Sequence, residues 1–265
     1  MIKFKHVVLP SPEQMEFDIE GVRNAFRSWD RMDSDVDCEN PNKYVLGPND
    51  SKLCKRLACA GAEHRKFMRS MQIRVRVTAP LYWWKEYDTY KIGTVTESES
   101  TMHTIAQREF RLEDFSVEHL MNVPGEGVLP PLALLKTTID TLNACRKLYL
   151  GTPSPDGSIG ISENRKDIWW QMIQLLPSSY NQTRNITLSY EAAANIYRQR
   201  KYHKLDEWRE FCSFLETLPY PEFIIGKDCS TTILYGDNMQ TVITQSADEI
   251  RIKVIPTNIK KGDNL

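Results

Sequence analysis

The sequence is 265 residues long, and its 41% hydrophobic and 26% charged content is ordinary for a soluble globular protein. Lysine and arginine total 34 and aspartate and glutamate 35, so the formal net charge is −1. That balance leaves no global field to favour nucleic acid or an anionic membrane, although local basic clusters can still bind a phosphate. No apolar run approaches the ~20 residues that a membrane-spanning helix needs. The length suits one large domain, or one domain with appendages.

The cysteines are scattered and form no CxxC pair. The two that lie nearest to each other, Cys54 and Cys59, are spaced so that they do not share one face of a helix. The opening stretch, MIKFKHVVLPSPEQ, lacks the apolar run of a signal peptide. We therefore expect a cytoplasmic protein with reduced thiols, mostly buried as small hydrophobic side chains, and no metal site.

The first quarter of the chain predicts one strand and two helices. The predicted elements are a strand over 3–9, a helix over 13–31, a polar loop over 33–50 and a helix from residue 51 onward. Asn49-Asp50-Ser51 supplies N-cap candidates for the second helix, which either ends at Gly61 or continues past it.

The stretch from Ile73 to His103 has the features of a ligand-binding wall. Apolar residues at 73, 75 and 77 alternate with arginines at 74 and 76, which predicts a strand with one buried face. Ala79-Pro80 ends the strand because proline has no amide hydrogen to donate. An aromatic helix start follows over 81–88. Residues 94–103 are small, hydroxylic or acidic, and they predict a loop.

The rest of the chain predicts mainly helices and then short strands. In order, the predicted elements are a turn over 124–127, a long helix from Pro130-Pro131 to Tyr149, a loop over 151–160, helices over 163–176, 187–201 and 205–215, and strands over 231–234, 241–244 and 250–254 with a turn at 236–238. Strands and helices without regular βαβ alternation predict an α+β fold, with a mixed or antiparallel sheet flanked by helices. We expect a main domain over 1–228 and a small C-terminal β extension over 229–265.

Three common catalytic or nucleotide-binding signatures do not occur in the sequence. There is no GxGxxG, no GxxxxGK[ST] and no GxSxG. A Rossmann fingerprint, a P-loop and a nucleophile elbow are therefore excluded.

The order of features after Ile73 resembles that of the flavin-dependent thymidylate synthases. In that family, Ala-Pro is followed by a short segment, an Arg-His-Arg triplet, a Ser, and an Asn-Glu-x-Ser-x-Arg-Tyr run. Counted from Ala79-Pro80 without gaps, Thr89-Tyr90-Lys91 falls on the triplet, Thr94 on the Ser, Thr96 on the Asn and Glu97 on the Glu. With one inserted residue, Ser100-Thr101-Met102-His103 falls on Ser-x-Arg-Tyr instead.

A second block follows in the family's order and at about its spacing. The family has Leu-Pro, then an Asn-x-Arg, then an arginine on the same helix. After Leu176-Pro177, the chain places Ser189 and Glu191 at the Asn and Arg positions, keeps Arg200, and has Arg209 on the next helix. The two blocks cover most of residues 62–214, whereas residues 229–265 have no counterpart.

The resemblance implies C5 methylation of a uridine-type nucleotide, dUMP to dTMP, with methylene-tetrahydrofolate as carbon source and reduced FAD as hydride source. It also implies a homotetramer with active sites at subunit interfaces, and no nucleophilic cysteine. The implied nucleotide contacts are Tyr90, Lys91, Glu97, Ser100 and Arg200. The implied cofactor contacts are His64, Thr94 and Ser189.

Departures from the family pattern leave a second interpretation open. Thr-Tyr-Lys keeps one cation of the triplet, and Glu191 cannot imitate a guanidinium fork because it accepts hydrogen bonds and carries the opposite charge. Lys91 and Arg200 still suit a phosphate, and Tyr90 can stack on a base. The alternatives are a non-catalytic or repurposed nucleotide-binding oligomer on the same scaffold, and an unrelated α+β protein.

Each candidate also has a purely structural interpretation. Trp83-Trp84 suits a core or a subunit interface as well as a stacking platform, and Arg74 and Arg76 suit a plain solvated face. Glu97 and Glu99 suit a solvated loop, and His64 suits the surface of a polar helix. His103 remains ambiguous, and the basic residues at 198–201 are favourable at a helix C-terminus.

Overall fold

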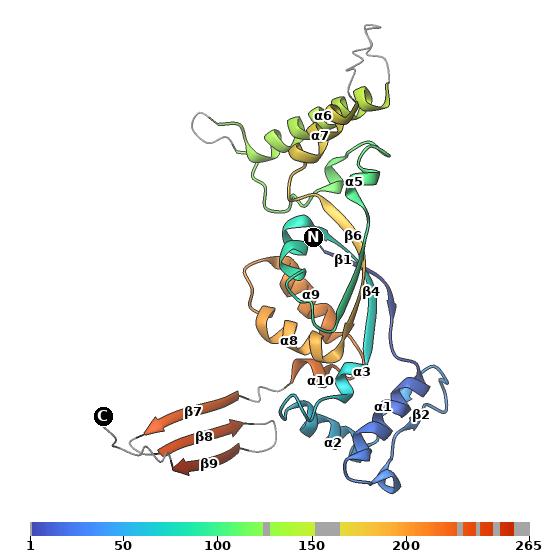
Figure 1. Cartoon of the computed structure of the whole chain (residues 1–265), viewed down its shortest axis with the longest axis vertical. Helices are drawn as coiled ribbons and strands as arrows, with labels where there is room; N and C mark the ends of the chain where they lie inside the picture. The colour runs from blue at the N-terminus through green and yellow to red at the C-terminus, as the bar shows by residue number, and fades with distance from the viewer. Residues whose placement is uncertain are drawn as a thin grey trace, which may run out of the picture. The chain divides into compact units, whose positions relative to one another are not determined.

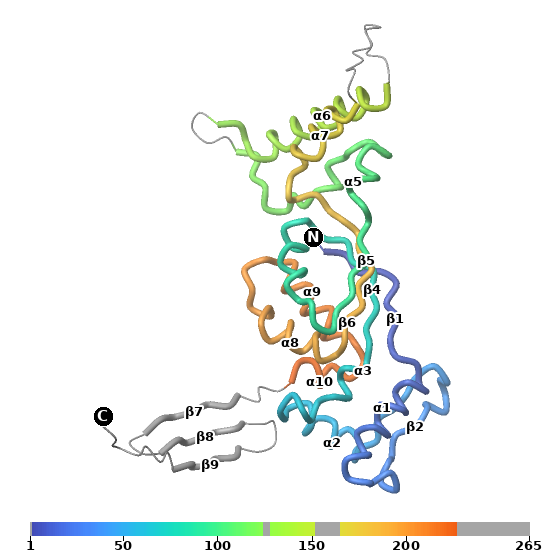
Figure 2. Tube along the Cα trace, in the orientation of Figure 1, coloured from blue at the N-terminus to red at the C-terminus, as the bar shows by residue number. Residues whose placement is uncertain are grey.

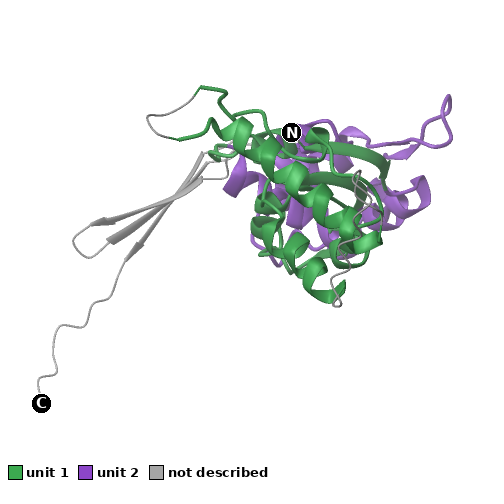
Figure 3. Ribbon diagram, turned by 90° about the horizontal axis from the view of Figure 1, so that it is seen from above, with its two compact units in different colours: residues 1–9, 73–188, 202–211 green, residues 10–72, 189–201, 212–265 purple. Residues whose placement is uncertain are grey.

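The computed structural model describes residues 2–123, 128–151 and 165–226, together with the backbones of 230–236, 239–245 and 250–256. The chain divides into two compact units, coloured separately in Figure 3. Unit 1 comprises residues 1–9, 73–188 and 202–211, and unit 2 comprises residues 10–72, 189–201 and 212–265. Each unit therefore combines segments that are far apart in the sequence. The separate C-terminal domain over 229–265 stays a prediction.

Unit 1 is built on a four-stranded sheet in the order β1-β4-β6-β5, whose strands are all labelled in Figure 2 and, except for β5, also in Figure 1. Its strands are β1 (Lys3–Val8), β4 (Gln72–Pro80), β6 (Asn181–Ser189) and β5 (Thr94–Ser98). β1 pairs antiparallel with β4, and β5 pairs antiparallel with β6. The β4 and β6 strands run in opposite directions too, because Thr78 meets Thr183 and Arg76 meets Asn185. This antiparallel sheet flanked by helices confirms the predicted α+β class.

The helices distribute over both units. Unit 1 holds α4 (Leu81–Tyr87), α5 (Thr101–Thr104), α6 (Pro131–Leu150) and α7 (Arg165–Leu175); unit 2 holds α1 (Pro12–Asn24), α2 (Pro48–Ala58), α3 (Phe67–Ser70), α8 (Tyr190–Arg200) and α10 (Pro221–Ile225); α9 (Asp206–Glu216) begins in unit 1 and ends in unit 2. Unit 2 also has the short hairpin strands β2 (Asp35–Val36) and β3 (Tyr44–Val45). Within the described residues, no helix is long and apolar enough to cross a membrane.

Strand β4 buries one face and exposes the other, as the alternation predicts. Ile73, Val75 and Val77 are buried, whereas Arg74 and Arg76 are exposed. Because proline at 80 ends the strand and α4 starts at once, the aromatic residues of α4 fold back over the buried face.

The core of unit 1 on this side of the sheet is aromatic. Trp83 and Trp84 on α4 and Trp208 on α9 are all 0% exposed, and the Trp83 ring centroid lies 4.8 Å from each of the other two. The Trp84 indole nitrogen donates to the Gln182 carbonyl at 2.9 Å, which ties α4 to β6. Each buried ring removes about 150–250 Å² from water. The paired tryptophans are therefore core residues of unit 1 rather than an exposed stacking surface.

Several predicted elements differ from the observed ones. The first part of the predicted loop over 94–103 is the strand β5, and the predicted helix over 187–201 begins only at Tyr190, because residues 181–189 form β6. The first helix ends at Asn24 rather than at 31, and Arg27 adopts a left-handed backbone with φ of 48°. Gly47 caps α2 in place of the predicted residues 49–51.

The tail forms a three-stranded antiparallel sheet, as predicted. Its strands are β7 (Ser230–Gly236), β8 (Met239–Gln245) and β9 (Ile250–Pro256), in that order. The long helix from Pro130-Pro131 is confirmed as α6. The predicted turns over 124–127 and at 237–238, and most of the predicted loop over 151–160, lie outside the described residues.

A buried ion pair fixes the first half of unit 2. Asp50 on α2 is 0% exposed and lies 2.5 Å from the guanidinium of Arg23 on α1. The second oxygen of the same carboxylate accepts from the Ser34 hydroxyl at 2.6 Å and from the Asp33 amide at 2.9 Å. Burial alone would raise the pKa of Asp50, but these hydrogen bonds and Arg23 outweigh it and hold that pKa below its usual range.

We expect Asp50→Asn to lower the free energy of unfolding by about 3–5 kcal/mol at pH 7, because Arg23 is left buried without its partner. The depressed pKa of Asp50 stabilises the fold above the ordinary carboxyl value of about 3.9, and this contribution disappears as the pH falls through the folded value. Urea titrations between pH 7 and pH 3 measure both effects. The exposed control Asp30→Asn should change the free energy by less than about 0.5 kcal/mol. An Asp50→Asn variant as stable as this control would contradict the assignment.

Candidate functional site

The sequence-predicted site residues fall into both units. Unit 1 contains Tyr90, Lys91, Thr94, Glu97 and Ser100. Unit 2 contains His64, Ser189 and Arg200. The single site that combines them stays a prediction, and each group is described by its own surroundings below.

Tyr90 and Thr94 contribute to the packing between α4 and β5. The Tyr90 ring is half-buried and lies edge-on against Trp208, with centroids 5.9 Å apart. The Thr94 hydroxyl donates to the Tyr90 carbonyl, which closes the turn before β5. Both residues therefore have internal contacts in unit 1.

Lys91, Glu97 and Ser100 are exposed. Lys91 stands in the turn between α4 and β5, next to Ile92, which is 93% exposed. Glu97 is directly opposite Asn185 on β6, so it lies on the face of the sheet that carries Arg76. Thr94 is opposite Leu188 and lies on the other face. The two faces of β5 thus separate the predicted nucleotide contact Glu97 from the predicted cofactor contact Thr94.

Ser189 is the N-cap of α8. Its hydroxyl accepts a hydrogen bond from the Ala192 amide at 3.1 Å, and the residue is 3% exposed. This bond satisfies one of the amides that the first turn of a helix leaves without a partner. The Ser189 hydroxyl therefore already accepts a hydrogen bond from the first turn of α8.

Glu191 forms an ion pair with two arginines in unit 2. Its carboxylate receives Nε and Nη2 of Arg69 at 2.5 and 3.3 Å, and Arg65 Nε lies 3.7 Å away. Arg69 also donates to the Ala62 carbonyl at 3.2 Å. The position at which the resemblance expects an arginine therefore carries a carboxylate that neighbouring arginines neutralise.

The two remaining candidates in unit 2 are His64, in a turn, and Arg200, at the end of a helix. His64 is exposed in a turn rather than on a helix, and its Nε2 lies 3.4 Å from the Glu63 carboxylate. Arg200 is the last residue of α8 and is half-buried. A cation there is also favourable for the helix C-terminus.

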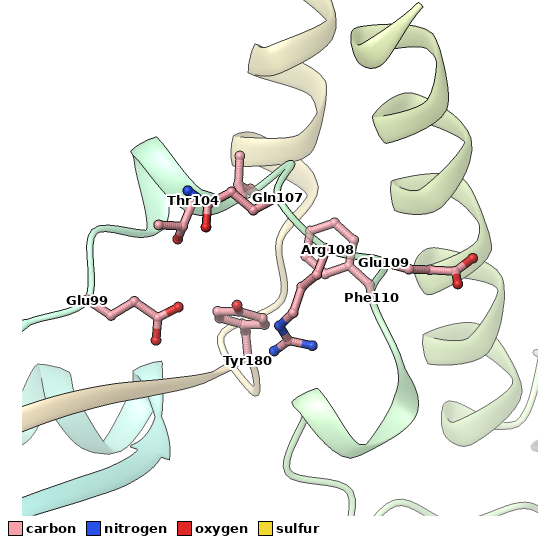
Figure 4. A pocket seen from close by; sticks show the side chains of 8 residues that line it. Glu99, Thr104, Gln107, Arg108, Glu109, Phe110 and Tyr180 are labelled. Carbon is pink, nitrogen blue, oxygen red and sulfur yellow. The ribbon is translucent and has the colours of Figure 1, made fainter. Parts of the chain in front are cut away.

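A cavity of about 280 Å³ opens in unit 1 beside the end of the β5 strand (Figure 4). Its lining residues come from the 99–110 segment and from the residue that directly precedes β6: Glu99, Thr104, Ile105, Gln107, Arg108, Glu109, Phe110 and Tyr180. Figure 4 shows Tyr180 between Glu99 and Arg108, whereas Glu109 points away toward another helix. Ligand pockets commonly measure about 300–1,000 Å³, so this cavity suits a base-sized or sugar-sized group.

Side chains of α6 hold the wall of this cavity in place. The Asn143 side chain exchanges two hydrogen bonds with the Phe110 backbone, at 2.8 and 2.9 Å. The Arg146 guanidinium donates to the Ala106 carbonyl at 3.0 Å. Below the wall, Phe110 and Tyr180 belong to the buried cluster that α6 and α7 share. Hydrogen bonds from α6 therefore anchor the wall of the cavity.

The polar groups of the cavity are mostly acceptors or neutral donors. Arg108 is held by Asp114 through two contacts at 2.7 and 2.6 Å, so its charge is already compensated. Burial, reinforced by the charge of Glu99, raises the pKa of the Tyr180 phenol, and Tyr180 stays a neutral donor at neutral pH. A neutral ligand with both donors and acceptors fits these groups better than an anion.

Sequence reasoning did not find most of this cavity. Glu99 lies in the hydroxylic and acidic stretch over 94–103, but Arg108 and Tyr180 are far from each other in the sequence and form no motif. No pattern of spacing signals their proximity, because it depends on how α6 anchors residues 105–110.

The two buried cysteines of the described residues, Cys54 and Cys212, are poor candidates for a nucleophile. Burial raises the pKa of both Cys54 and Cys212 to about 12, which keeps these thiols protonated. Among the described residues there is also no cluster of three histidine, cysteine, aspartate or glutamate side chains that could hold a metal ion.

Comparison with known proteins gives a likeness of fold. No protein-family model matches the chain, and no curated protein matches it by sequence. Two crystal structures of the flavin-dependent thymidylate synthase ThyX from Helicobacter pylori, each with FAD and dUMP, align over 86% of this chain and 97% or 98% of theirs, with a TM-score of 0.54 and 15% identity. The chain therefore has a ThyX-like α+β fold.

A more distant structural likeness adds nothing to this conclusion. The UMP/dUMP methylase PolB from Streptomyces cacaoi, bound with 5-Br dUMP, aligns over 82% of this chain and 88% of its own at 14% identity. Its TM-score of 0.47 is too low to support an argument about this chain.

The residues at the expected flavin positions of α8 do not fit that cofactor. FAD carries a pyrophosphate and hydrogen-bond acceptors, which require donors and cations. The Ser189 hydroxyl is used as a helix cap, and the Glu191 carboxylate would repel a phosphate while it occupies Arg69. If FAD binds to this chain, other residues must hold it.

We expect Ser189→Ala to lower the free energy of unfolding by about 1 kcal/mol, the usual cost of losing an N-cap, and Ser189→Asp to retain most of that stability. Chemical denaturation of both variants measures the difference. Ser213→Ala, at an exposed serine within α9, is the control and should change the free energy by less than about 0.5 kcal/mol. A Ser189→Ala variant of unchanged stability would contradict the capping role.

Proposed function

We propose that this protein methylates C5 of a uridine-type nucleotide, dUMP to dTMP, with methylene-tetrahydrofolate and reduced FAD as co-substrate and cofactor. The observation that carries this proposal is the fold: 86% of the chain aligns with a thymidylate synthase solved with FAD and dUMP. We further propose that the protein is a cytoplasmic homotetramer and that its partner is a small-molecule nucleotide rather than a nucleic acid or a membrane.

The unit 1 cavity is the proposed site for the base. The edge of a uracil ring presents one N–H donor between two carbonyl acceptors. The Glu99 carboxylate can accept from that N–H, and the neutral Tyr180 phenol and the Gln107 amide can donate to the carbonyls. These groups supply position and hydrogen bonding rather than a nucleophile.

The phosphate is proposed to lie outside this cavity. Glu99 is a lining residue, and Arg108 is already paired with Asp114, so the local field is unfavourable for a dianion. Lys91 and Arg200 remain the proposed phosphate-binding cations, with Tyr90 and Ser100 as neighbouring contacts in the nucleotide. His64 and Thr94 remain proposed cofactor contacts, whereas Ser189 would act only through the start of α8.

The purified protein should bind FAD, give the absorbance of a bound flavin, and form dTMP from dUMP when methylene-tetrahydrofolate and a flavin reductant are supplied. Absorbance spectra after gel filtration measure cofactor binding, and chromatography of the nucleotides measures turnover. A protein that retains no FAD and forms no dTMP would contradict the enzymatic proposal.

We expect Lys91→Ala to weaken dUMP binding by about tenfold or more, because a lysine–phosphate contact of ~1.5–3 kcal/mol is lost. Isothermal titration calorimetry with dUMP and with deoxyuridine, which lacks the phosphate, measures the effect. Lys85→Ala, at another exposed lysine in the same region, is the matched control and should bind as the wild type does. Equal loss in both variants, or equal loss for deoxyuridine, would contradict a phosphate contact at Lys91.

A second candidate function is nucleotide binding without catalysis. The observation that favours it is the ion pair of Glu191 with Arg69, which replaces an expected arginine at the flavin position with a neutralised carboxylate. Under this alternative, dUMP or a thymidine nucleotide raises the melting temperature of the protein in the absence of FAD, and no dTMP is formed. Any turnover of dUMP excludes it.

A further inference from the structure

Two arginines of unit 2 share one carboxylate. Arg69, on the short helix α3, donates from Nε and Nη2 to Glu191 in the first turn of α8, at 2.5 and 3.3 Å. Arg65, in the segment before α3, approaches the same carboxylate with its Nε atom at 3.7 Å. Arginine stays protonated in proteins, so two positive charges face one negative charge. The group therefore keeps a surplus of one positive charge.

Arg65 is mostly buried, yet its Nε atom has no hydrogen-bond acceptor among the described residues. The side chain is 18% exposed, and Nε itself is buried. The contact with Glu191 at 3.7 Å is longer than a hydrogen bond. A buried donor without an acceptor is unfavourable. Arg65 therefore offers a donor that a bound ligand could satisfy.

Backbone contacts anchor the helix that carries Arg69. The Arg69 guanidinium also donates to the Ala62 carbonyl at 3.2 Å, and the Gln72 side chain donates to the Arg69 carbonyl at 2.6 Å. The Tyr190 amide donates to the Met71 carbonyl at 2.9 Å, which ties the end of α3 to the start of α8. The two helices pack against each other within unit 2 (Figure 1). This anchoring lowers the conformational cost of binding a ligand at Arg69.

A phosphate group matches the two arginines better than a single carboxylate does. The Glu191 carboxylate carries one negative charge, whereas a phosphate monoester carries about −1.5 to −2 at neutral pH and has three acceptor oxygens. A guanidinium fork can bind two of these oxygens at once. The exposed Lys66 lies between the two arginines in the sequence and adds a third cation to the segment. A dianion would therefore compensate the charge that Glu191 leaves uncompensated.

We propose that Arg65 and Arg69 form a phosphate-binding site in unit 2, and that the Glu191 carboxylate occupies this site when no ligand is bound. The phosphate displaces the carboxylate from Arg69 and gives Nε of Arg65 the acceptor that it lacks. After displacement, Glu191 stays in the first turn of α8, where a negative charge is favourable. The site goes beyond the proposed function, because it uses none of the residues assigned there to the base, the nucleotide or the cofactor.

Glu191 sets the affinity of this site. An incoming phosphate competes with a carboxylate that the fold holds beside the arginines. The apparent affinity therefore falls by the fraction of molecules in which the arginines are free of Glu191. The carboxylate also repels the phosphate while it remains nearby. We therefore expect weak phosphate binding by the wild type and stronger binding once the charge of Glu191 is removed.

Isothermal titration calorimetry of the full chain with inorganic phosphate tests the proposal, with sodium chloride keeping the ionic strength constant. We expect Glu191→Gln, which removes the charge and keeps the size of the side chain, to strengthen phosphate binding at least tenfold. Glu20→Gln, at an exposed glutamate of α1, is the matched control and should bind phosphate as the wild type does. The double variants Arg65→Gln/Glu191→Gln and Arg69→Gln/Glu191→Gln should each lose the gain.

Ribose 5-phosphate, titrated in the same way, identifies the form of phosphate that the site takes. A gain in Glu191→Gln for both probes supports a site that accepts the phosphate of a larger molecule. A gain for inorganic phosphate alone supports a site for the free anion. No gain for either probe, or a gain that both double variants keep, would overturn the proposal and leave Glu191 as a structural ion pair. Neither probe is dUMP or FAD, so the outcome is separate from that of the proposed function.

A measurement without the Glu191 variant decides the matter if Glu191→Gln does not fold. Phosphate should raise the melting temperature of the wild type more than that of Arg65→Gln, because a ligand that binds only the folded state stabilises it. This comparison cancels the general stabilising effect of phosphate on proteins. Arg56→Gln, at an exposed arginine of α2, is the control and should respond like the wild type. Equal shifts in all three proteins would then overturn the proposal.

Discussion

Unit 1 depends on the two unlike faces of strand β4. Its aliphatic residues at 73, 75 and 77 are buried in the core, and so are Trp83, Trp84 and Trp208. Its arginines at 74 and 76 must stay hydrated or paired, so the other face of the sheet cannot be covered by an apolar layer. A slip of one residue would exchange the two faces and place guanidinium groups against the tryptophans. The register of β4 therefore also fixes the neighbouring strands and the order of charges across them.

The parts of the fold that local sequence patterns determine were predictable. Residues close together in the sequence determine three such features: the alternation in β4, the apolar period and proline start of α6, and the strands of the tail. β5 and β6 were not predictable, because their hydroxylic and polar residues acquire strand structure by pairing on a sheet that is half solvated. The predicted first helix was too long because Phe26 and Trp29 keep helical spacing in the sequence. In the structure these two residues are 56% and 47% exposed and follow the end of α1.

The candidate site was harder to predict than the fold. The resemblance to a family assigns a role to each residue from its position in the sequence alone. In the structure, however, Ser189 caps a helix and Glu191 pairs with Arg69, and both contacts lie within unit 2. The cavity beside β5 depends instead on long-range anchoring, since Asn143 and Arg146 hold residues 106–110 against Tyr180. No short motif encodes such a contact, because its two sides approach each other only after α6 and β6 are in place.

Glu99 links this cavity to strand β6. Its backbone carbonyl accepts from the Gln182 side chain at 2.7 Å and its carboxylate from the Thr183 amide, so β6 fixes its position from both sides. The charge of the Glu99 carboxylate therefore contributes to the electrostatic field inside the cavity that it lines. Because this carboxylate is an acceptor, it favours a neutral ligand that donates a hydrogen bond over an anion.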